Sequence, residues 1–205
     1  MRKTIALFAC IALALSSVNV SGQADGGYGV TVEYTANPFN SSSFLSPGFF
    51  RAKYLTGQLG FRLGVQANVT NTQPEPTTIE HVGFFDLRPG FEFHTGFGKA
   101  SPYAGVEFII MNQSANKNST SELGVANATN EFGSNQAFFG WGGAIVTGID
   151  YYWGEKFYFG FEIGLDVVNI NFKDVMMAEE IVIESTQTFT GFVNMNNTLK
   201  MGFNF

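Results

Sequence analysis

The chain has 205 residues, of which 45% are hydrophobic and 14% charged, with 24 glycines and 23 phenylalanines. That length suits one domain, and the aromatic, glycine-rich composition is typical of a β protein rather than of a helical bundle. The formal net charge of −6 argues against a nucleic-acid partner, because phosphate contacts need clustered Lys and Arg.

The N-terminal segment has the features of a cleaved secretory signal peptide. It begins with basic residues, continues with an apolar core over residues 5–15, and ends in small residues at Gly22 and Ala24. Cleavage after either of these two residues fits the pattern. We therefore divide the chain into a signal peptide, residues 1–24, and a mature domain, residues 25–205.

Cys10 is the only cysteine and leaves with the signal peptide, so the mature domain has no disulfide. A lipoprotein is the alternative interpretation, but Cys10 falls in the middle of the apolar core and not at the cleavage point. Cleavage lowers the basic count from 11 to 9 against 17 acidic residues, which gives a formal charge of −8. No later run approaches the roughly 18 apolar residues of a transmembrane helix, so any membrane insertion must use strands.

Alternation of apolar and polar residues with a period of two recurs along the mature domain and predicts β-strands. The clearest case is 157–167, where every odd position is apolar and Glu162 and Asp166 lie on the opposite face. In chain order, the alternating segments are 27–37, 49–55, 59–69, 82–94, 103–113, 137–153, 157–167 and 188–205.

The connections between these segments alternate in length. The short ones are 56–58, 95–101 and 154–156, and the long polar ones are 38–47, 70–81, 114–135 and roughly 171–187. This order fits an all-β, eight-stranded antiparallel up-and-down transmembrane β-barrel with short periplasmic turns and long extracellular loops.

Alternation alone does not say which face is the interior. A soluble barrel would keep its apolar side chains inside, whereas a transmembrane barrel turns them toward lipid. Because so many Phe residues facing water would aggregate, we expect the apolar face to contact lipid. Aromatic residues next to the short links suit an interface girdle, although β-propensity and core packing would also place them there: Tyr54, Phe93, Tyr103, Tyr151, Tyr152, Trp153, Phe157 and Tyr158.

The polar face carries acids and bases in nearly equal number. Buried charges must be paired, so we hypothesise an ion-pair network that plugs the lumen instead of lining a water-filled channel. The more specific alternative is that the same groups relay protons or solutes through the barrel. The expected network consists of Glu33, Arg51, Lys53, Arg62, Asp86, Arg88, Glu92, Glu107, Glu162, Asp166 and Lys200.

Signs of catalysis are weak. His81 and His94 lack the spacing of metal ligands, and the hydroxyl-rich stretch Ser41–Ser43 lacks a Gly-x-Ser-x-Gly elbow. We therefore expect no catalytic, metal-binding or cofactor-binding residues and no enzyme activity.

Several phrases in the mature domain resemble the small outer-membrane β-barrel proteins of Gram-negative bacteria, of the outer-membrane-protein-A and -X type. They are 32–39, 51–54, 59–64, 87–92, 101–107, 148–152 and the terminal 202–205. The resemblance implies an eight-stranded barrel in the outer membrane, porin-like in build. It also implies that Phe205 acts as the C-terminal signal for the barrel-insertion machinery, and it carries no catalytic residues.

The sequence thus predicts a non-enzymatic cell-surface barrel that contacts outer-membrane lipid and serves membrane integrity or surface interaction. The stretch 173–187, in which Asp174 and three Glu residues flank a set of apolar residues, could contact an extracellular partner, although strands extending above the membrane would give the same pattern. The alternatives are a narrow channel or carrier for small solutes, and a secreted or periplasmic soluble barrel.

Overall fold

The computed structural model describes residues 28–36, 49–95, 99–120, 123–154, 156–194 and 199–204. Every regular element in these ranges is a β-strand, so the described chain is all-β. No helix in these ranges is long and apolar enough to cross a membrane. The predicted signal peptide, the stretch Ser41–Ser43 and Phe205 lie outside the described residues.

The strands belong to one antiparallel sheet. The long strands are β3 (Leu59–Glu75), β4 (Thr78–His94), β5 (Ala100–Ser119), β7 (Phe138–Trp153) and β8 (Phe157–Phe172). The shorter ones are β1 (Tyr28–Ala36), β2 (Phe49–Thr56), β6 (Val125–Ala126), β9 (Val175–Met177), β10 (Glu180–Ile183), β11 (Gln187–Asn194) and β12 (Leu199–Asn204). Each alternating segment of the sequence contains a strand.

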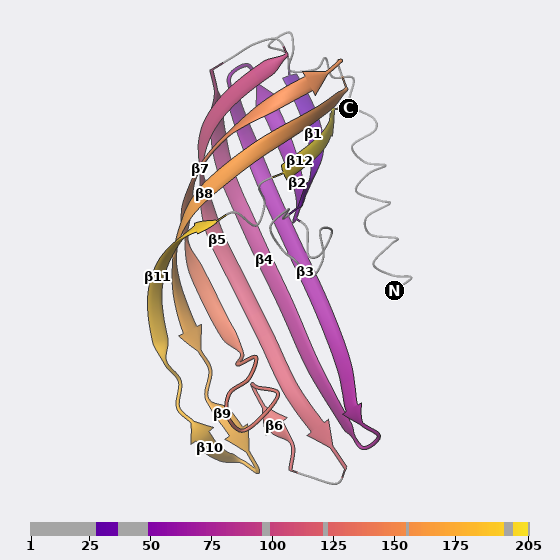
Figure 1. Cartoon of the computed structure of the whole chain (residues 1–205). Helices are drawn as coiled ribbons and strands as arrows, with labels where there is room; N and C mark the ends of the chain where they lie inside the picture. The colour runs from indigo at the N-terminus through magenta and orange to yellow at the C-terminus, as the bar shows by residue number, and fades with distance from the viewer. Residues whose placement is uncertain are drawn as a thin grey trace.

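Neighbouring strands pair mainly in chain order, from β1 through β2, β3 and β4 to β5. The strand β7 lies between β5 and β8, and β8 pairs with both β11 and β12. The strand β12 also pairs with β1, with Glu33 opposite Gly202. The sheet curls along its length, and the short connections gather at its upper end in Figure 1.

Two of the short connections contain a glycine in the left-handed region. Gly57, between β2 and β3, and Gly154, after β7, both adopt a positive φ, which glycine reaches without strain. Hydrogen bonds tie neighbouring connections together at this end, from the amide of His94 to the carbonyl of Gln58 and from Tyr152 to Lys99. The short links of the sequence therefore lie together at one end of the sheet.

The long connections contain more strand than the sequence predicted. The stretch 70–81 is not a loop, because β3 and β4 continue pairing as far as Glu75 and Thr78. The stretch 114–135 includes the end of β5 and all of β6, and 171–187 includes β9 and β10. The polar composition shows where the strands lose their apolar face. Backbone pairing continues there, because polar residues can still form the hydrogen bonds of a β-ladder.

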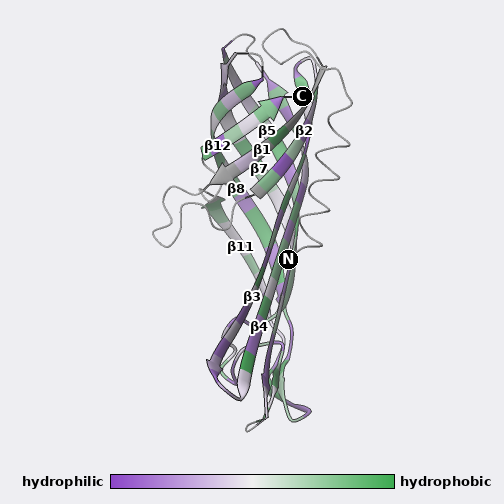
Figure 2. Cartoon of the chain, turned by 90° about the vertical axis from the view of Figure 1, so that its right-hand side faces the viewer, coloured by the Kyte–Doolittle hydropathy of each residue, from purple (hydrophilic) through white to green (hydrophobic). Residues whose placement is uncertain are grey.

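The burial of side chains alternates along the strands, and it is opposite to that of a water-soluble sheet. Large apolar side chains are exposed, including Phe91, Phe108 and Trp141, whereas Arg51 and Glu92 are buried. Figure 2 shows hydrophobic and hydrophilic residues alternating along the strands. We call the two sides the apolar outer face and the polar inner face.

Glycines on the inner face make room for aromatic rings. Gly202 on β12 lies opposite Tyr158 on β8, and a Cβ atom at Gly202 would overlap the Tyr158 ring. Tyr158 is buried and packs beside Tyr152, with ring centroids 5.1 Å apart. The small residue at 202 therefore lets a tyrosine ring lie flat against the neighbouring strand.

We expect Gly202→Ala to lower the free energy of unfolding by about 1–3 kcal/mol, because the methyl group forces the Tyr158 ring to move within a packed interior. Gly143→Ala is the matched control, since a Cβ there meets only the Glu107 carbonyl oxygen at 3.5 Å. The control should change stability by less than about 0.5 kcal/mol. Urea unfolding in detergent, which covers the apolar outer face, measures both; equal effects would contradict the packing account.

Candidate functional site: a buried network of ion pairs

Charged side chains from seven strands meet on the inner face of the sheet. Among the described residues, the buried ones are five basic and six acidic groups, so their formal charges nearly cancel. The basic groups are Arg51, Lys53, Arg62, Arg88 and Lys200; the acidic ones are Asp86, Glu92, Glu107, Asp150, Glu162 and Asp166. Each strand contributes them at alternate positions, which points them all to one side.

Arg62 is the centre of the network. Its guanidinium group contacts three carboxylates: Glu92 at 3.1 Å, Glu107 at 2.7 Å and Glu162 at 2.8 Å. Arg51 shares two of these, lying 3.1 Å from Glu162 and 3.4 Å from Glu107. Two guanidinium groups thus bridge β2 and β3 to β5 and β8 across the interior.

Arg88 forms a second group toward the long hairpins. Its side chain contacts Asp86 on the same strand at 3.0 Å and Asp166 on β8 at 2.8 Å. Two of its nitrogens, Nε and Nη2, donate to the Asp86 carboxylate, which holds the guanidinium plane in place. Arg88 also lies 3.9 Å from Glu107, which joins this group to the centre.

The two lysines form a third group toward the short connections. Lys53 contacts Glu92 at 2.9 Å and Asp150 at 3.3 Å, and Lys200 contacts Asp150 at 2.7 Å. The Lys200 ammonium donates to the Tyr103 hydroxyl at 2.6 Å, and this hydroxyl donates to Glu162 at 2.5 Å. A continuous chain of hydrogen bonds therefore links the lysines to the central glutamates.

His94 ends the network near the short connections. Its Nε2 atom lies 2.9 Å from Glu92 Oε1, and its Nδ1 atom lies 2.8 Å from the Ser101 hydroxyl. Ser, His and Glu in hydrogen-bonded sequence also form the catalytic triads of hydrolases. Here Ser101 is only 1% exposed, so a substrate could not reach its hydroxyl without opening the sheet.

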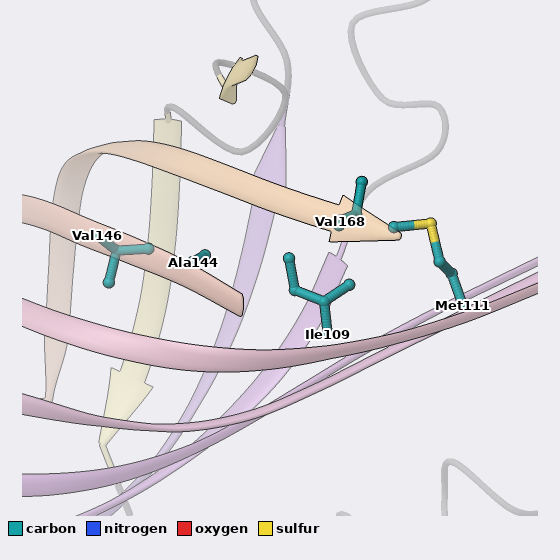
Figure 3. Packing of buried hydrophobic residues seen from close by; sticks show 5 residues of the cluster. All are labelled: Ile109, Met111, Ala144, Val146 and Val168. Atoms are coloured by element: carbon teal, nitrogen blue, oxygen red, sulfur yellow. The ribbon is translucent and has the colours of Figure 1, made fainter. Parts of the chain in front are cut away.

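An apolar cluster lies beside the charges on the side of the long hairpins. Figure 3 shows Ile109 and Met111 of β5, Ala144 and Val146 of β7, and Val168 of β8 pointing toward one another. Phe84, Phe138 and Ile170 pack against them. The inner face is thus polar near the short connections and apolar further along.

The space left between the charges is small. A cavity of about 10 Å³ lies among Arg51, Arg88, Glu107, Glu162 and Asp166. This is about the smallest volume that holds one water molecule. Among the described residues, no group of three or more His, Cys, Asp or Glu side chains is arranged to hold a metal ion.

The structure brings together every residue of the expected network except Glu33, whose side chain lies outside the described part of the chain. The network also contains residues that were not predicted: Asp150, which pairs with both lysines, and the hydrogen-bonded partners His94, Ser101 and Tyr103. Asp150 and His94 could have been predicted as members of the network, because both lie on the polar face of an alternating segment.

Part of the expected aromatic girdle is wrong. Tyr103, Tyr152 and Tyr158 are buried on the inner face, at 3%, 2% and 1% exposure. In the alternating pattern of their segments these three tyrosines fall on the polar face. A tyrosine hydroxyl can form hydrogen bonds with buried charged groups there. Tyr54, Phe93, Tyr151 and Trp153 do lie exposed on the outer face.

His81 is far from this network. It lies on the extended β3–β4 hairpin, where its ring nitrogen Nδ1 contacts the Asn71 side-chain oxygen at 2.5 Å.

The comparisons with models of known protein families and with curated proteins found no match for the chain.

Proposed function

We propose that this chain is a non-enzymatic β-barrel protein of the outer membrane of a Gram-negative bacterium, with a closed interior and a surface role for its long hairpins. One observation carries the proposal: burial is inverted. Arg62 is 3% exposed, whereas Ile145 is 64% exposed. Such a molecule would aggregate in water, but it suits a lipid environment around a polar interior.

The strand pairing supports a closed barrel of eight strands. Starting from β1, the pairing passes through β2, β3, β4, β5, β7, β8 and β12 and returns to β1. The strands β11 and β12 pair with successive parts of β8, so we count them as one interrupted strand. Such closure would leave no open strand edge within a membrane, which a bilayer requires.

The spacing of the two tryptophans supports a membrane-spanning zone. Trp141 and Trp153 both lie exposed on the outer face of β7. At about 3.3 Å per residue and a tilt of about 45°, the stretch between them spans roughly 28 Å, close to the ~30 Å hydrocarbon core. Ile145 and Ile149 lie between them and are also exposed. Tryptophans at both boundaries are typical of membrane barrels.

Cell fractionation tests the location. We expect the mature protein in the outer-membrane fraction, migrating on gels at a different apparent mass when unheated than when boiled, because a folded barrel resists unfolding by cold detergent. Recovery in the soluble periplasmic fraction, with one migration at both temperatures, would refute the proposal.

The packed interior supports a closed barrel over the channel or carrier that the sequence left open. Ion pairs fill one part of the inner face, and the apolar cluster that includes Ile109 and Val168 occupies the next part. An eight-stranded barrel leaves room for little beyond its own side chains. Side chains that fill the inner face argue against a pore, so we favour membrane integrity and contact with molecules outside the cell as the roles of this protein.

We expect the purified, folded monomer to give no steady nanosiemens-scale conductance in planar bilayers, because ion pairs and the apolar cluster occupy successive parts of the inner face. Liposome swelling with small sugars should likewise match that of protein-free vesicles. A stable open pore, or permeability that changes on Arg62 or Glu162 substitution, would favour the channel instead.

A further inference from the structure

The strands β6, β9 and β10 extend the sheet beyond the ion-pair network. The strand β9 pairs with β6, β6 pairs with the end of β5, and β10 ends the strand order. In Figure 1 these strands lie at the lower end, opposite the short connections. Among the described strands, β10 pairs with β9 alone.

Buried contacts and hydrogen bonds hold this end of the sheet in place. Val125, Ala128 and Val175 are buried beneath it, with Ile183 packed against them. The Asn127 side chain donates to the Asp174 carbonyl at 2.8 Å, and the Asp174 carboxylate accepts from the Ser185 amide at 2.6 Å. A preorganised surface loses little conformational entropy when a partner binds.

The strand β10 has exposed apolar side chains on both of its faces. Ile181 and Val182 are 55% and 41% exposed, and Phe132 on the neighbouring loop is 82% exposed. Gly133, next to Phe132, approaches Ile183, since a Cβ atom built on Gly133 would lie 3.0 Å from its Cδ1. Apolar side chains beside an open strand edge are an aggregation hazard that proteins normally cover.

Acidic residues surround these apolar side chains. Glu179 and Glu180 precede it on the chain, Glu184 follows it, and Glu131 adjoins Phe132; all four are exposed. Acidic groups protect an edge from pairing with a second copy, because the mature chain itself carries a formal charge of −8. They repel lipid phosphates for the same reason. They attract a basic partner.

We propose that β10 is a docking edge for an extended, basic segment of another protein, in which apolar and basic residues alternate. The segment would add a strand to β10, place its apolar side chains on the face of Ile181, and pair its basic ones with Glu180 on the opposite face and with Glu179 in the adjoining turn. This rests on the proposed function, which puts the hairpin outside the cell.

The test uses the full mature chain folded into lipid vesicles and a synthetic peptide of alternating valine and lysine. We expect saturable binding that weakens with salt, and slower hydrogen exchange of the β10 amides in the complex. A peptide of the same composition, with its lysines and valines in two blocks, should bind at least about tenfold more weakly. Equal binding of both peptides, or no protection of β10, would overturn strand addition.

Two matched variants locate the site. Glu179→Lys with Glu180→Lys should weaken binding of the alternating peptide about tenfold or more at low salt. Glu75→Lys with Glu80→Lys, on the β3–β4 hairpin, should leave it unchanged. Equal weakening by both pairs would mean general charge attraction and would refute the site. A chain that enters vesicles but binds no peptide refutes this inference alone, whereas a chain that fails to enter vesicles refutes the proposed function.

Discussion

Replacing Arg62 with methionine is expected to lower the free energy of unfolding in detergent micelles by about 3–5 kcal/mol. The guanidinium group lies within 3.1 Å of Glu92, Glu107 and Glu162, and all four groups are buried. Without it, three carboxylates face one another with only partial compensation from their other partners. The loss therefore comes from uncompensated buried charge, and the methionine fills much of the vacated volume.

A double variant separates this electrostatic cause from lost packing. Adding Glu162→Gln to Arg62→Met removes one of the stranded charges, so the pair should lose less stability than the two single changes summed. Lys99→Met is the control, because Lys99 is exposed and its replacement should cost less than about 0.5 kcal/mol. Additive losses in the double variant, measured by urea unfolding, would show that Arg62 and Glu162 act independently and would contradict a coupled network.

Much of this network could be predicted from sequence because a strand has a period of two. Once Phe159 and Phe161 are assigned to one face, Glu162 must lie on the other, whatever its partner. The partners themselves could not be predicted. Arg62 meets Glu162 across 100 positions of sequence, and which groups meet depends on the register of strands in between, which alternation does not specify.

The hairpins beyond the apolar zone were less predictable for a related reason. In residues 66–75 both faces of β3 are mostly exposed, so the sequence has no apolar face to reveal its period. The stretch 70–81 therefore looked like a loop, although Asn71 and His81 occupy a paired register. Tyr103 and Tyr158 were wrongly predicted to lie on the outer face. A tyrosine combines an apolar ring with a polar hydroxyl, so its side chain suits either face.

Arginine at Ile145 is expected to block insertion into lipid. Ile145 lies on the outer face of β7, between the two tryptophans that we place at the membrane boundaries. A charged side chain near the middle of the bilayer costs a barrel about 2–4 kcal/mol. In water the same change would cost almost nothing, because the Ile145 side chain is already exposed.

Ile79→Arg is the matched control. Ile79 is a second exposed isoleucine on the outer face, 50% exposed, but it lies at the far end of β4, beyond the zone that we assign to lipid. We expect this variant to insert into vesicles as the unmodified chain does.

One vesicle-folding experiment that compares Ile145→Arg with Ile79→Arg, read by the gel migration of unheated samples, tests whether the barrel spans a membrane. For a membrane-spanning barrel we expect a large loss of the folded form for Ile145→Arg and no loss for Ile79→Arg. Equal folding of both variants, in vesicles and in plain buffer alike, would contradict a membrane-spanning barrel.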